Sequence, residues 1–384
     1  MRCKLSDICS YRKGKTEVKR LNNITYISTE NMLPNKGGIT EASSLPSIVL
    51  TQEYRKGDVL VSNIRPYFKK IWQAKYDGGC SNDVLVFTPN PMTDKDFLYY
   101  VLANDEFFLY SMATSKGTKM PRGDKDSIMQ YEIPDIGLDR QRKIASVLKS
   151  LDGKIQLNIA INNNLEQQLT ALFIHSFADN IATTSTDTCP ILGDLITVVD
   201  NRGKTPPLAT ETFAYPIIDV GVLKGSDRII DFNNCTKYVE QSTYETWFRS
   251  GHPKPWDILI STVGSLAEMK IYLGSKGCIA QNVVALRATS ISPLYLYQYL
   301  RFIRADLVAY NIGSVQPSIK VTHIAKHPIY VPESSKLENF EEIAKTVTNQ
   351  LYANYNEIES LKKLRDTLLP RLMSGELDVS AIDI

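Results

Sequence analysis

Several features that would assign this chain of 384 residues to a class at once are missing from it. No segment approaches the roughly 20 apolar residues that a membrane-spanning helix requires, and residues 1–16 lack the apolar core of a signal peptide. The six cysteines are scattered and none forms a Cys-x-x-Cys pair, which argues against a disulfide framework and a zinc site. We therefore expect a cytoplasmic protein with reduced thiols and no membrane partner.

The sequence also has almost no excess of charge, because 44 Lys and Arg stand against 42 Asp and Glu. Nucleic-acid-binding domains often carry a strong basic excess, whereas the net charge here is only +2. A DNA-binding face would have to be a local patch of cations. Charge therefore permits a DNA-binding function without indicating one.

What the sequence does contain is an internal repeat, whose spacing drifts from 187 to 199 residues. Two copies are too few for a solenoid, which needs at least three repeats. A chain with two similar copies has two similar sites, so its partner is expected to have two recognisable parts. The paired segments are Leu5–Ile8 with Leu192–Leu195, Arg12–Thr16 with Asn201–Thr205, Gly57–Ser62 with Trp256–Ser261, Gly117–Pro121 with Gly313–Pro317, Ile133-Pro134 with Val331-Pro332, and Ile144-Ala145 with Ile343-Ala344.

Each copy begins with a globular part of mixed α/β character. Short β-rich runs separated by Gly, Pro and Asn predict strands, and a stretch with Tyr, Phe and Leu at helical spacing predicts a helix. We expect these aromatic side chains in the core rather than as a platform for stacking bases. The expected strands are Asp58–Ser62, Asp83–Phe87, Asp257–Ser261 and Asn282–Leu286, and the expected helices are Asp96–Met112 and Pro293–Ala309.

A long helix then closes each copy. From Gln141 to Phe177 the chain has no Pro and a single Gly, and apolar residues recur at steps of four and three, the seam pattern of a coiled coil. A second seam runs from Val347 to Leu372, and Pro370 is expected to break its last turn. The apolar seam positions are Ile144, Leu148, Leu151, Ile155, Leu165, Leu169, Val347, Leu351, Ile358, Leu361 and Leu368.

The two seams would span about 55 Å and roughly 45 Å, more than one globular part can cover. We expect the helices to pack on each other, antiparallel, with Asn158 and Asn162 in the seam fixing the register. Ordinary amphipathic surface helices are the alternative. The expected domains are 1–140 and 190–335 as globular parts, 141–178 as the first spacer helix, 179–189 as a linker, and 336–384 as the second spacer helix with the C-terminal tail.

No catalytic signal in the sequence is complete. Gly14-Lys15-Thr16 and Gly203-Lys204-Thr205 imitate the end of a phosphate-binding loop but lack the required Gly five residues earlier. Asp257 with Glu268-Met269-Lys270 imitates a metal-dependent nuclease, but the first copy has no matching acid. The tetrapeptide of adenine methyltransferases and a Gly-rich loop for S-adenosylmethionine are also missing. The chain therefore reads as non-catalytic, with no metal site.

The two α/β halves, each closing with Ile-Pro or Val-Pro and a helix that opens with Ile-Ala, together resemble the specificity subunit of type I restriction–modification systems. The resemblance covers the whole chain in register, and the closing stretch Leu361–Leu377 is very similar to that family's last segment. Gly203–Pro206, Gly57–Leu60 and Asn162–Glu166 are equally typical. One departure is Arg140-Gln141, where the family usually has Glu-Gln before the helix.

The resemblance implies two target-recognition domains, related by a pseudo-twofold and separated by an antiparallel coiled coil, in a mixed α/β fold. Each domain would read one half of a bipartite, asymmetric sequence in double-stranded DNA, and the coiled coil would set the unspecific gap. Two modification subunits would dock beside the helices, where a surface charge such as Glu166 would serve assembly, and methylate adenine with S-adenosylmethionine. Restriction subunits would add ATP-driven translocation and cleavage, with ATP and Mg as their cofactors, and this chain would bind no cofactor.

Loops that combine cations, amides and Gly are the candidate DNA contacts, because Arg and Lys pair with guanine or phosphate, and Asn and Gln with adenine. The Gly-Lys-Thr segments recur in both copies, although the two halves would read different bases. This recurrence favours a phosphate-binding or structural role for these segments. A fused nuclease or methyltransferase, and a purely structural coiled-coil scaffold, are the other functions considered. The candidates are Arg12, Lys13, Lys15, Thr16, Asn63, Arg65, Lys69, Lys116, Lys119, Arg122, Arg202, Lys204, Thr205, Thr262, Ser265, Ser314, Gln316 and Lys320.

Overall fold

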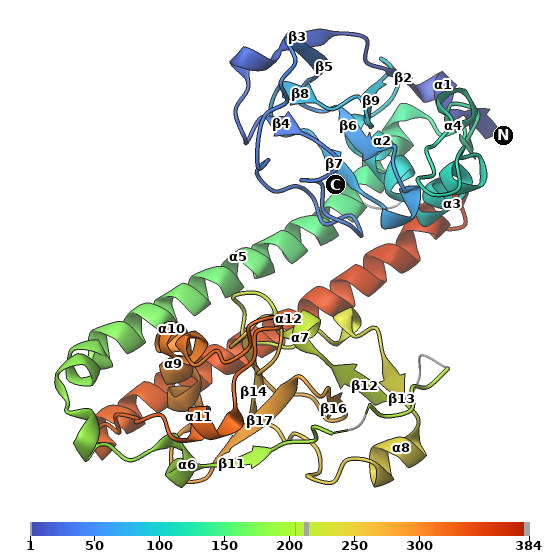
Figure 1. The fold of residues 1–384 in the computed structure, drawn as a ribbon. Helices are drawn as coiled ribbons and strands as arrows, with labels where there is room; N and C mark the ends of the chain where they lie inside the picture. The colour runs from blue at the N-terminus through green and yellow to red at the C-terminus, as the bar shows by residue number, and fades with distance from the viewer. Residues whose placement is uncertain (1, 204, 211–214, 380–384) are drawn as a thin grey trace. The chain divides into compact units, whose positions relative to one another are not determined.

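The computed structural model describes residues 2–203, 205–210 and 215–379, and the chain divides into two compact units (Figure 1). Unit 1 consists of Met1–Gln156 and Glu359–Ile384, and unit 2 of Leu157–Ile358. The boundary crosses both long helices, so each unit joins a globular part to one end of each helix. The expected mixed α/β class is confirmed. Among the described residues, no helix is both long and apolar enough to cross a membrane.

Unit 1 contains two four-stranded sheets and one two-stranded sheet. The first sheet is antiparallel throughout, with the order β2 (Cys9–Tyr11), β9 (Val84–Pro89), β6 (Val59–Ser62) and β7 (Ile71–Gln73). The second has the order β3 (Lys15–Glu17), β5 (Leu50–Tyr54), β8 (Gly78–Cys80) and β4 (Tyr26–Ile27), and the third pairs β1 (Arg2–Lys4) with β10 (Glu132–Pro134). The short helices are α1 (Leu5–Ile8), α2 (Lys95–Ala103), α3 (Asp105–Ala113) and α4 (Lys125–Ile128).

Burial on both faces explains the unbroken apolar sequence of the central strand β6. Side chains alternate along a strand, so Val59 and Val61 enter one core while Leu60 enters a second core together with Tyr54 and Trp72. The strands expected at residues 58–62 and 83–87 are therefore confirmed as β6 and β9.

Unit 2 repeats the first sheet of unit 1, with Ile258 and Ile260 in one core and Leu259 in another. This sheet has the order β11 (Ile196–Val199), β17 (Val283–Ala288), β14 (Ile258–Ser261) and β15 (Met269–Ile271), and a three-stranded sheet has the order β13 (Tyr238–Val239), β12 (Tyr215–Ile218) and β16 (Cys278–Ile279). The short helices are α6 (Leu192–Leu195), α7 (Val220–Leu223), α8 (Gln241–Thr246), α9 (Pro293–Phe302), α10 (Arg304–Ala309) and α11 (Val321–Ala325). The two expected strands are confirmed as β14 and β17.

The single helix expected in each globular part is wrong in both units, because each is two helices. In unit 1 the break falls at Asn104, whose side-chain oxygen accepts a hydrogen bond from the Glu106 backbone N–H and so caps α3. In unit 2 the break falls at Ile303. The expected core placement is confirmed for most of the aromatic residues, although Phe302 is 42% exposed; the following are buried: Phe97, Phe107, Phe108, Tyr295 and Tyr297.

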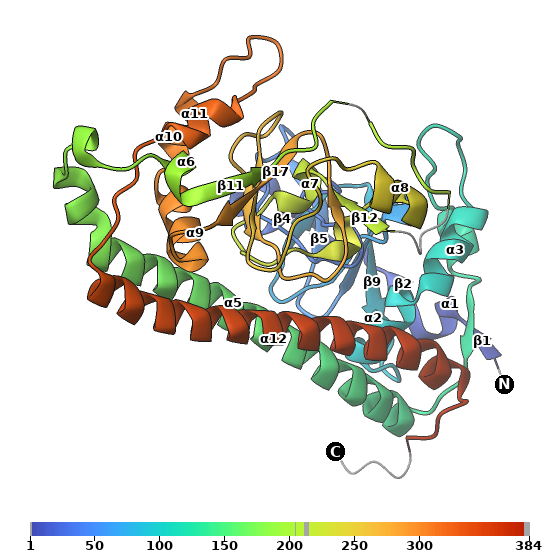
Figure 2. The same cartoon turned by 90° about the horizontal axis from the view of Figure 1, so that it is seen from below.

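Two helices are far longer than the others, α5 (Leu138–Thr183) and α12 (Ser334–Ser374) (Figure 2). Helix α5 begins before Gln141 and extends past Phe177, so the first part of the expected linker is helical. Pro370 lies inside α12, so the prediction that it breaks the last turn is wrong. A proline near a helix end removes only one backbone hydrogen bond, and the flanking leucines are anchored in the core of unit 1.

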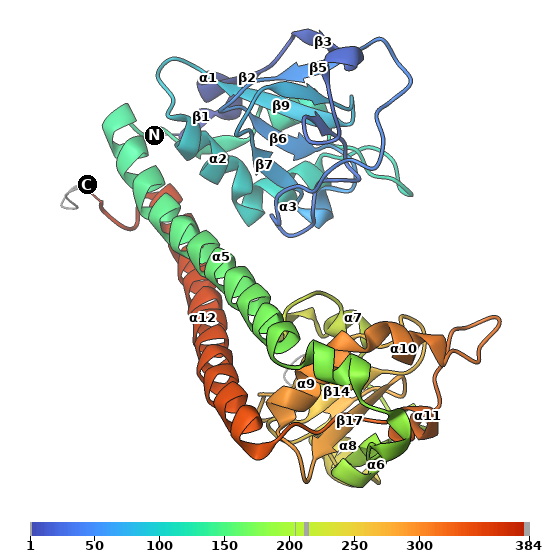
Figure 3. The same cartoon turned by 90° about the vertical axis from the view of Figure 1, so that its left-hand side faces the viewer.

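Within each unit the ends of α5 and α12 run side by side and antiparallel (Figure 3). In unit 1, Arg365 of α12 donates to Asp152 of α5 over 2.8 Å. In unit 2, Asn354 of α12 donates to Asn162 of α5 over 2.8 Å, as a register-fixing seam residue would. Every predicted seam position faces inward: Ile144, Leu148, Ile155, Leu169, Leu351 and Ile358 are buried, and Leu151, Leu165, Val347, Leu361 and Leu368 are partly buried.

The sequence suggests that the two helices bury their seams on each other. In the structure the seams are also buried against the globular parts. Leu148 of α5 belongs to the same core as Phe97 of α2 and Leu372 of α12. In unit 2, Phe173 of α5 and Phe340 of α12 share a core with the sheet, with ring centroids 5.8 Å apart. The globular parts therefore cover the helix ends.

Candidate nucleic-acid interface

Three loops meet at one end of the first sheet of unit 1. Strands β6 and β9 are antiparallel, so the chain leaves β6 where it enters β9. Backbone hydrogen bonds join the three loops, from the N–H of Asn63 to Asp83 O (2.8 Å), of Gly123 to Asn63 O (3.2 Å) and of Arg65 to Pro121 O (2.8 Å). We call residues 63–69, 81–83 and 115–124 the loop edge of unit 1.

Unit 2 repeats this hydrogen-bond scheme bond for bond. The N–H of Thr262 donates to Asn282 O (2.8 Å), that of Ile319 to Thr262 O (2.8 Å) and that of Gly264 to Pro317 O (2.9 Å). Residues 262–267, 280–282 and 311–320 form the loop edge of unit 2. The repeated Gly-xxx-Pro segments thus have a defined role, because the proline carbonyl at the end of each segment holds the neighbouring loop.

The side chains on the two loop edges differ although the backbone scheme is shared. The loop edge of unit 1 carries five Lys or Arg against two Asp, whereas that of unit 2 carries a single Lys and no acid. The structure brings together these predicted DNA contacts in each unit: Asn63, Arg65, Lys69, Lys116, Lys119 and Arg122 in unit 1, and Thr262, Ser265, Ser314, Gln316 and Lys320 in unit 2.

Several cations of the loop edge of unit 1 are held by carboxylates. Lys116 pairs with Asp124, and Arg122 pairs with Asp83 over 3.1 Å. The Lys116 ammonium, together with the hydrogen bonds from Ser127, holds the pKa of Asp124 well below its usual range. Exposed ion pairs of this kind are weak, so a phosphate group can compete for these cations.

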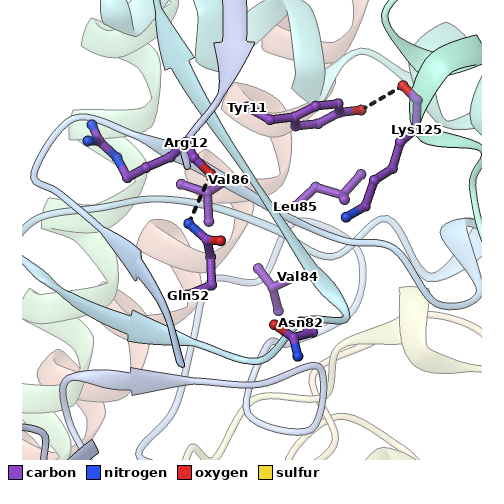
Figure 4. A pocket seen from close by; sticks show the side chains of 8 residues that line it. All are labelled: Tyr11, Arg12, Gln52, Asn82, Val84, Leu85, Val86 and Lys125. Carbon is purple, nitrogen blue, oxygen red and sulfur yellow. Dashed lines mark hydrogen bonds between the residues drawn. The ribbon is translucent and has the colours of Figure 1, made fainter. Parts of the chain in front are cut away.

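The segment that contains Arg12 lies beside this loop edge, across a hollow of about 190 Å³ (Figure 4). The Tyr11 hydroxyl donates to the carbonyl of Lys125 over 3.0 Å, and Gln52 Nε2 donates to the carbonyl of Arg12 over 3.0 Å. Asn82, from the turn 81–83, completes the polar lining. The hollow therefore lies between segment 11–16 and the loop edge, and both line it.

Arg12 itself is engaged inside unit 1, because its Nη2 donates to Asp58 Oδ1 over 2.8 Å. Asp58 is buried, and its hydrogen bond raises the pKa of Arg12. In unit 2 the matching Asp257 is held instead by Arg287, over 2.7 Å. The pair recurs with an arginine from another place in the fold, since Arg287 lies on β17 and Arg12 follows β2, and this recurrence indicates a structural role for Arg12.

The remaining predicted contacts lie in the two Gly-Lys-Thr segments. In unit 1, Lys13 and Lys15 are exposed and Thr16 is partly buried. In unit 2, the Thr205 hydroxyl accepts a hydrogen bond from Gln281 of the turn 280–282 over 3.0 Å, which places this segment against the loop edge. Arg202 pairs with Asp200 of its own loop over 2.5 Å, and Lys204 lies outside the described residues.

The sequence analysis missed the third loop of each edge, the turns 81–83 and 280–282. A signal for them was present, because Asn82-Asp83 and Gln281-Asn282 precede a strand in both copies. The sequence analysis took Asp83 and Asn282 as the first residues of the strands, whereas the strands begin one residue later. Their backbone bonds to Asn63 and Thr262 make them part of the candidate interface.

Comparison with known proteins shows what the chain is similar to. Residues 1–167 match the family model described as type I restriction modification DNA specificity domain. The chain is 24% identical over 311 residues to the type I restriction enzyme MjaIX specificity subunit of Methanocaldococcus jannaschii, over 75% of this chain and 70% of that protein. It is 24% identical over 462 residues to the HindI specificity subunit of Haemophilus influenzae, over 97% and 98% of the two chains. The first part of the chain is thus similar to the type I DNA specificity domain, and the chain as a whole is similar to type I specificity subunits.

A solved structure has the same fold as this chain. It is the S subunit of a type I restriction–modification system from M. genitalium, which aligns with a TM-score of 0.57 over 97% of this chain and 96% of that chain, at 17% identity. The two-copy architecture with two long helices expected from the sequence is therefore shared with a known S subunit.

The acidic residues that imitate a nuclease are each engaged by an arginine in unit 2. Asp257 is bound by Arg287, and Glu268 accepts from Arg304 over 2.6 Å. Lys270 is buried and donates to Asp227 over 2.6 Å. Among the described residues, no group of three His, Cys, Asp or Glu side chains is placed to hold a metal ion.

One buried ion pair of unit 2 was also missed, and it overturns the expectation for Glu166. This carboxylate is not on the helix surface, because both of its oxygens accept from Arg228, each over 2.8 Å. Arg228 is fully buried and also donates to Thr348 of α12 over 2.9 Å. We call Arg228, Glu166 and Thr348 the Arg228 clasp. It joins the globular part of unit 2 to both long helices, so Glu166 serves folding.

Unit 1 has a related junction built from different residues. Asp152 of α5 accepts from the Tyr100 hydroxyl over 2.7 Å and from Arg365 of α12 over 2.8 Å. Burial and the Asp152 carboxylate raise the pKa of Tyr100. In each unit, a carboxylate of α5 therefore takes part in a junction of the globular part with both long helices.

Proposed function

We propose that this chain reads a bipartite sequence in double-stranded DNA, one half with the loop edge of each unit, and takes no part in the chemistry. The observation that supports this is the backbone scheme repeated at both loop edges with unlike side chains. A shared backbone scheme would present both loop edges to the groove in the same way. Different side chains would then select different bases, because base edges carry the sequence information and phosphates do not.

The charge difference between the loop edges suggests how binding is divided between the units. Exposed lysines on the loop edge of unit 1, such as Lys116 and Lys119, suit phosphate contacts, which supply most of the non-specific affinity for DNA. Thr262 is fully buried, but the loop edge of unit 2 offers the exposed hydroxyl of Ser314 and amide of Gln316, which suit base edges and neutral contacts with phosphate.

We also propose that modification subunits dock on the outward faces of α5 and α12. Leu157 and Ile161, one turn apart on α5, are 55% and 39% exposed, and exposed apolar side chains often mark interaction sites. The modification subunits would bring S-adenosylmethionine and methylate adenine, and restriction subunits would bring the chemistry that depends on ATP and Mg.

Mapping of adenine methylation in the host genome tests this function. With the modification subunit present, deleting the gene for this chain should abolish methylation at one bipartite motif, and restoring the gene should return it. The purified chain alone, incubated with S-adenosylmethionine and DNA, should transfer no methyl groups. Methylation that persists without this chain, or transfer by the chain alone, would contradict the proposal and favour a fused enzyme.

A further inference from the structure

Arg65 occupies a backbone conformation that favours glycine. It lies at φ 51° and ψ 64°, in the left-handed region, where the N–H binds the Pro121 carbonyl. The equivalent residue of unit 2 is Gly264, at φ 88°, whose N–H binds the Pro317 carbonyl. The left-handed region is costly for residues with a side chain and free of that cost for glycine. Unit 1 therefore keeps an arginine where the fold alone would prefer glycine.

The Arg65 side chain also lacks an internal partner. Its Nε is buried and, among the described residues, has no hydrogen-bond partner. The neighbouring cations do have partners, since Lys69 forms an ion pair with Asp105 over 2.8 Å and Arg122 forms one with Asp83 over 3.1 Å. A buried N–H without a partner is unfavourable and is rare in native structures unless a ligand or water completes it.

Asn63, two residues before Arg65, shows the same feature, because its Oδ1 is buried without a partner among the described residues. In unit 2, Asn282 of the turn 280–282 also has a buried, unpartnered Oδ1. Unfavourable backbone geometry and unpaired polar groups gather at ligand-binding sites, where the ligand offsets their cost. Both loop edges thus have polar groups left open for an outside partner.

We propose that Arg65 is the specificity-determining residue of unit 1 and that its guanidinium reads a guanine in the DNA half-site bound there. The proposal rests on the proposed function. The guanidinium fork matches the two acceptors O6 and N7 on the major-groove edge of guanine. Two backbone hydrogen bonds between loops, from the Arg65 N–H to Pro121 O and from the Gly123 N–H to Asn63 O, fix the position of the Arg65 Cα. Base reading requires such a fixed position. A phosphate contact needs no such precision, and Lys119 or Lys116 can supply it.

The test is Arg65→Gly in the full chain, assembled with its modification subunit. Glycine is the residue of unit 2 at this position, so the thermal midpoint should stay within about 3 °C of the parent or rise. Affinity for the parent target should fall about 5- to 150-fold, and one guanine position of one half-site should become degenerate in methylation mapping. Arg65→Lys should not restore that position, because an ammonium lacks the fork.

Lys119→Ala is the matched control, because it removes an exposed cation from the same loop edge. It should weaken binding to all sequences alike and leave the methylated motif unchanged. Arg65→Gly would overturn the assignment if it weakened all sequences equally, or if it lowered the thermal midpoint by about 10 °C or more. A parent complex without any sequence preference would instead overturn the proposed function itself.

Discussion

Replacing Arg228 by alanine is expected to lower the free energy of unfolding of unit 2 by about 3–5 kcal/mol. The change leaves the buried Glu166 without the arginine that binds both of its oxygens, and among the described residues the only cation still near it is Arg301, at 3.9 Å. It also removes the hydrogen bond to Thr348 and the packing of the guanidinium over the Tyr297 ring, 5.2 Å from the centroid. Removing one member of a buried pair is more damaging than removing both.

Urea denaturation of the purified chain measures this effect, with the loss appearing in the transition that belongs to unit 2. The matched control is Arg202→Ala, which breaks an exposed pair with Asp200 in the same unit and should change stability by no more than about 0.5 kcal/mol. A double change of Arg228 and Glu166 to apolar residues should recover much of the loss. A cost below about 1 kcal/mol for Arg228→Ala would show that the clasp does not stabilise unit 2.

Leu148→Ala should have an effect of similar size in unit 1, about 2–5 kcal/mol. Leu148 is fully buried where α5, α12 and the globular part meet, so the cavity left by truncation has little room to collapse. Thermal or urea unfolding of the chain measures the loss. Leu109→Ala is the control in the same unit, because Leu109 is 68% exposed and its truncation should cost little. Equal effects of the two changes would refute the packing described for unit 1.

The parts of the fold that follow from local sequence were predictable. Strands β6 and β14 carry unbroken apolar runs because both of their faces are buried, and the long helices carry a seam at steps of four and three. The break at Asn104 was missed although Asn before two acids is a helix-start signal. That signal was outweighed by the helical spacing of the aromatic residues around it.

The sequence predicted several of the loops that form the candidate interface, but it did not predict which loops contact each other. The repeated Gly-xxx-Pro segments marked one loop in each unit, because a recurring turn leaves a local signature. The sequence does not reveal which loop each of these loops contacts, because backbone hydrogen bonds such as that from Asn63 to Asp83 determine the contact. The Arg228 clasp left no signal for the same reason, because Arg228 and Glu166 are 62 residues apart in the chain.

The central claim is that each unit reads its own half of the DNA site. Exchanging residues 190–335 for the matching part of a relative, followed by mapping of methylated adenines, tests it most directly. Residues 157–189 and 336–358, which include Glu166 and Thr348, stay in place, so the relative chosen should keep an arginine at the position of Arg228. The account predicts that one half of the methylated sequence changes while the other half is retained. A simultaneous change in both halves would contradict it.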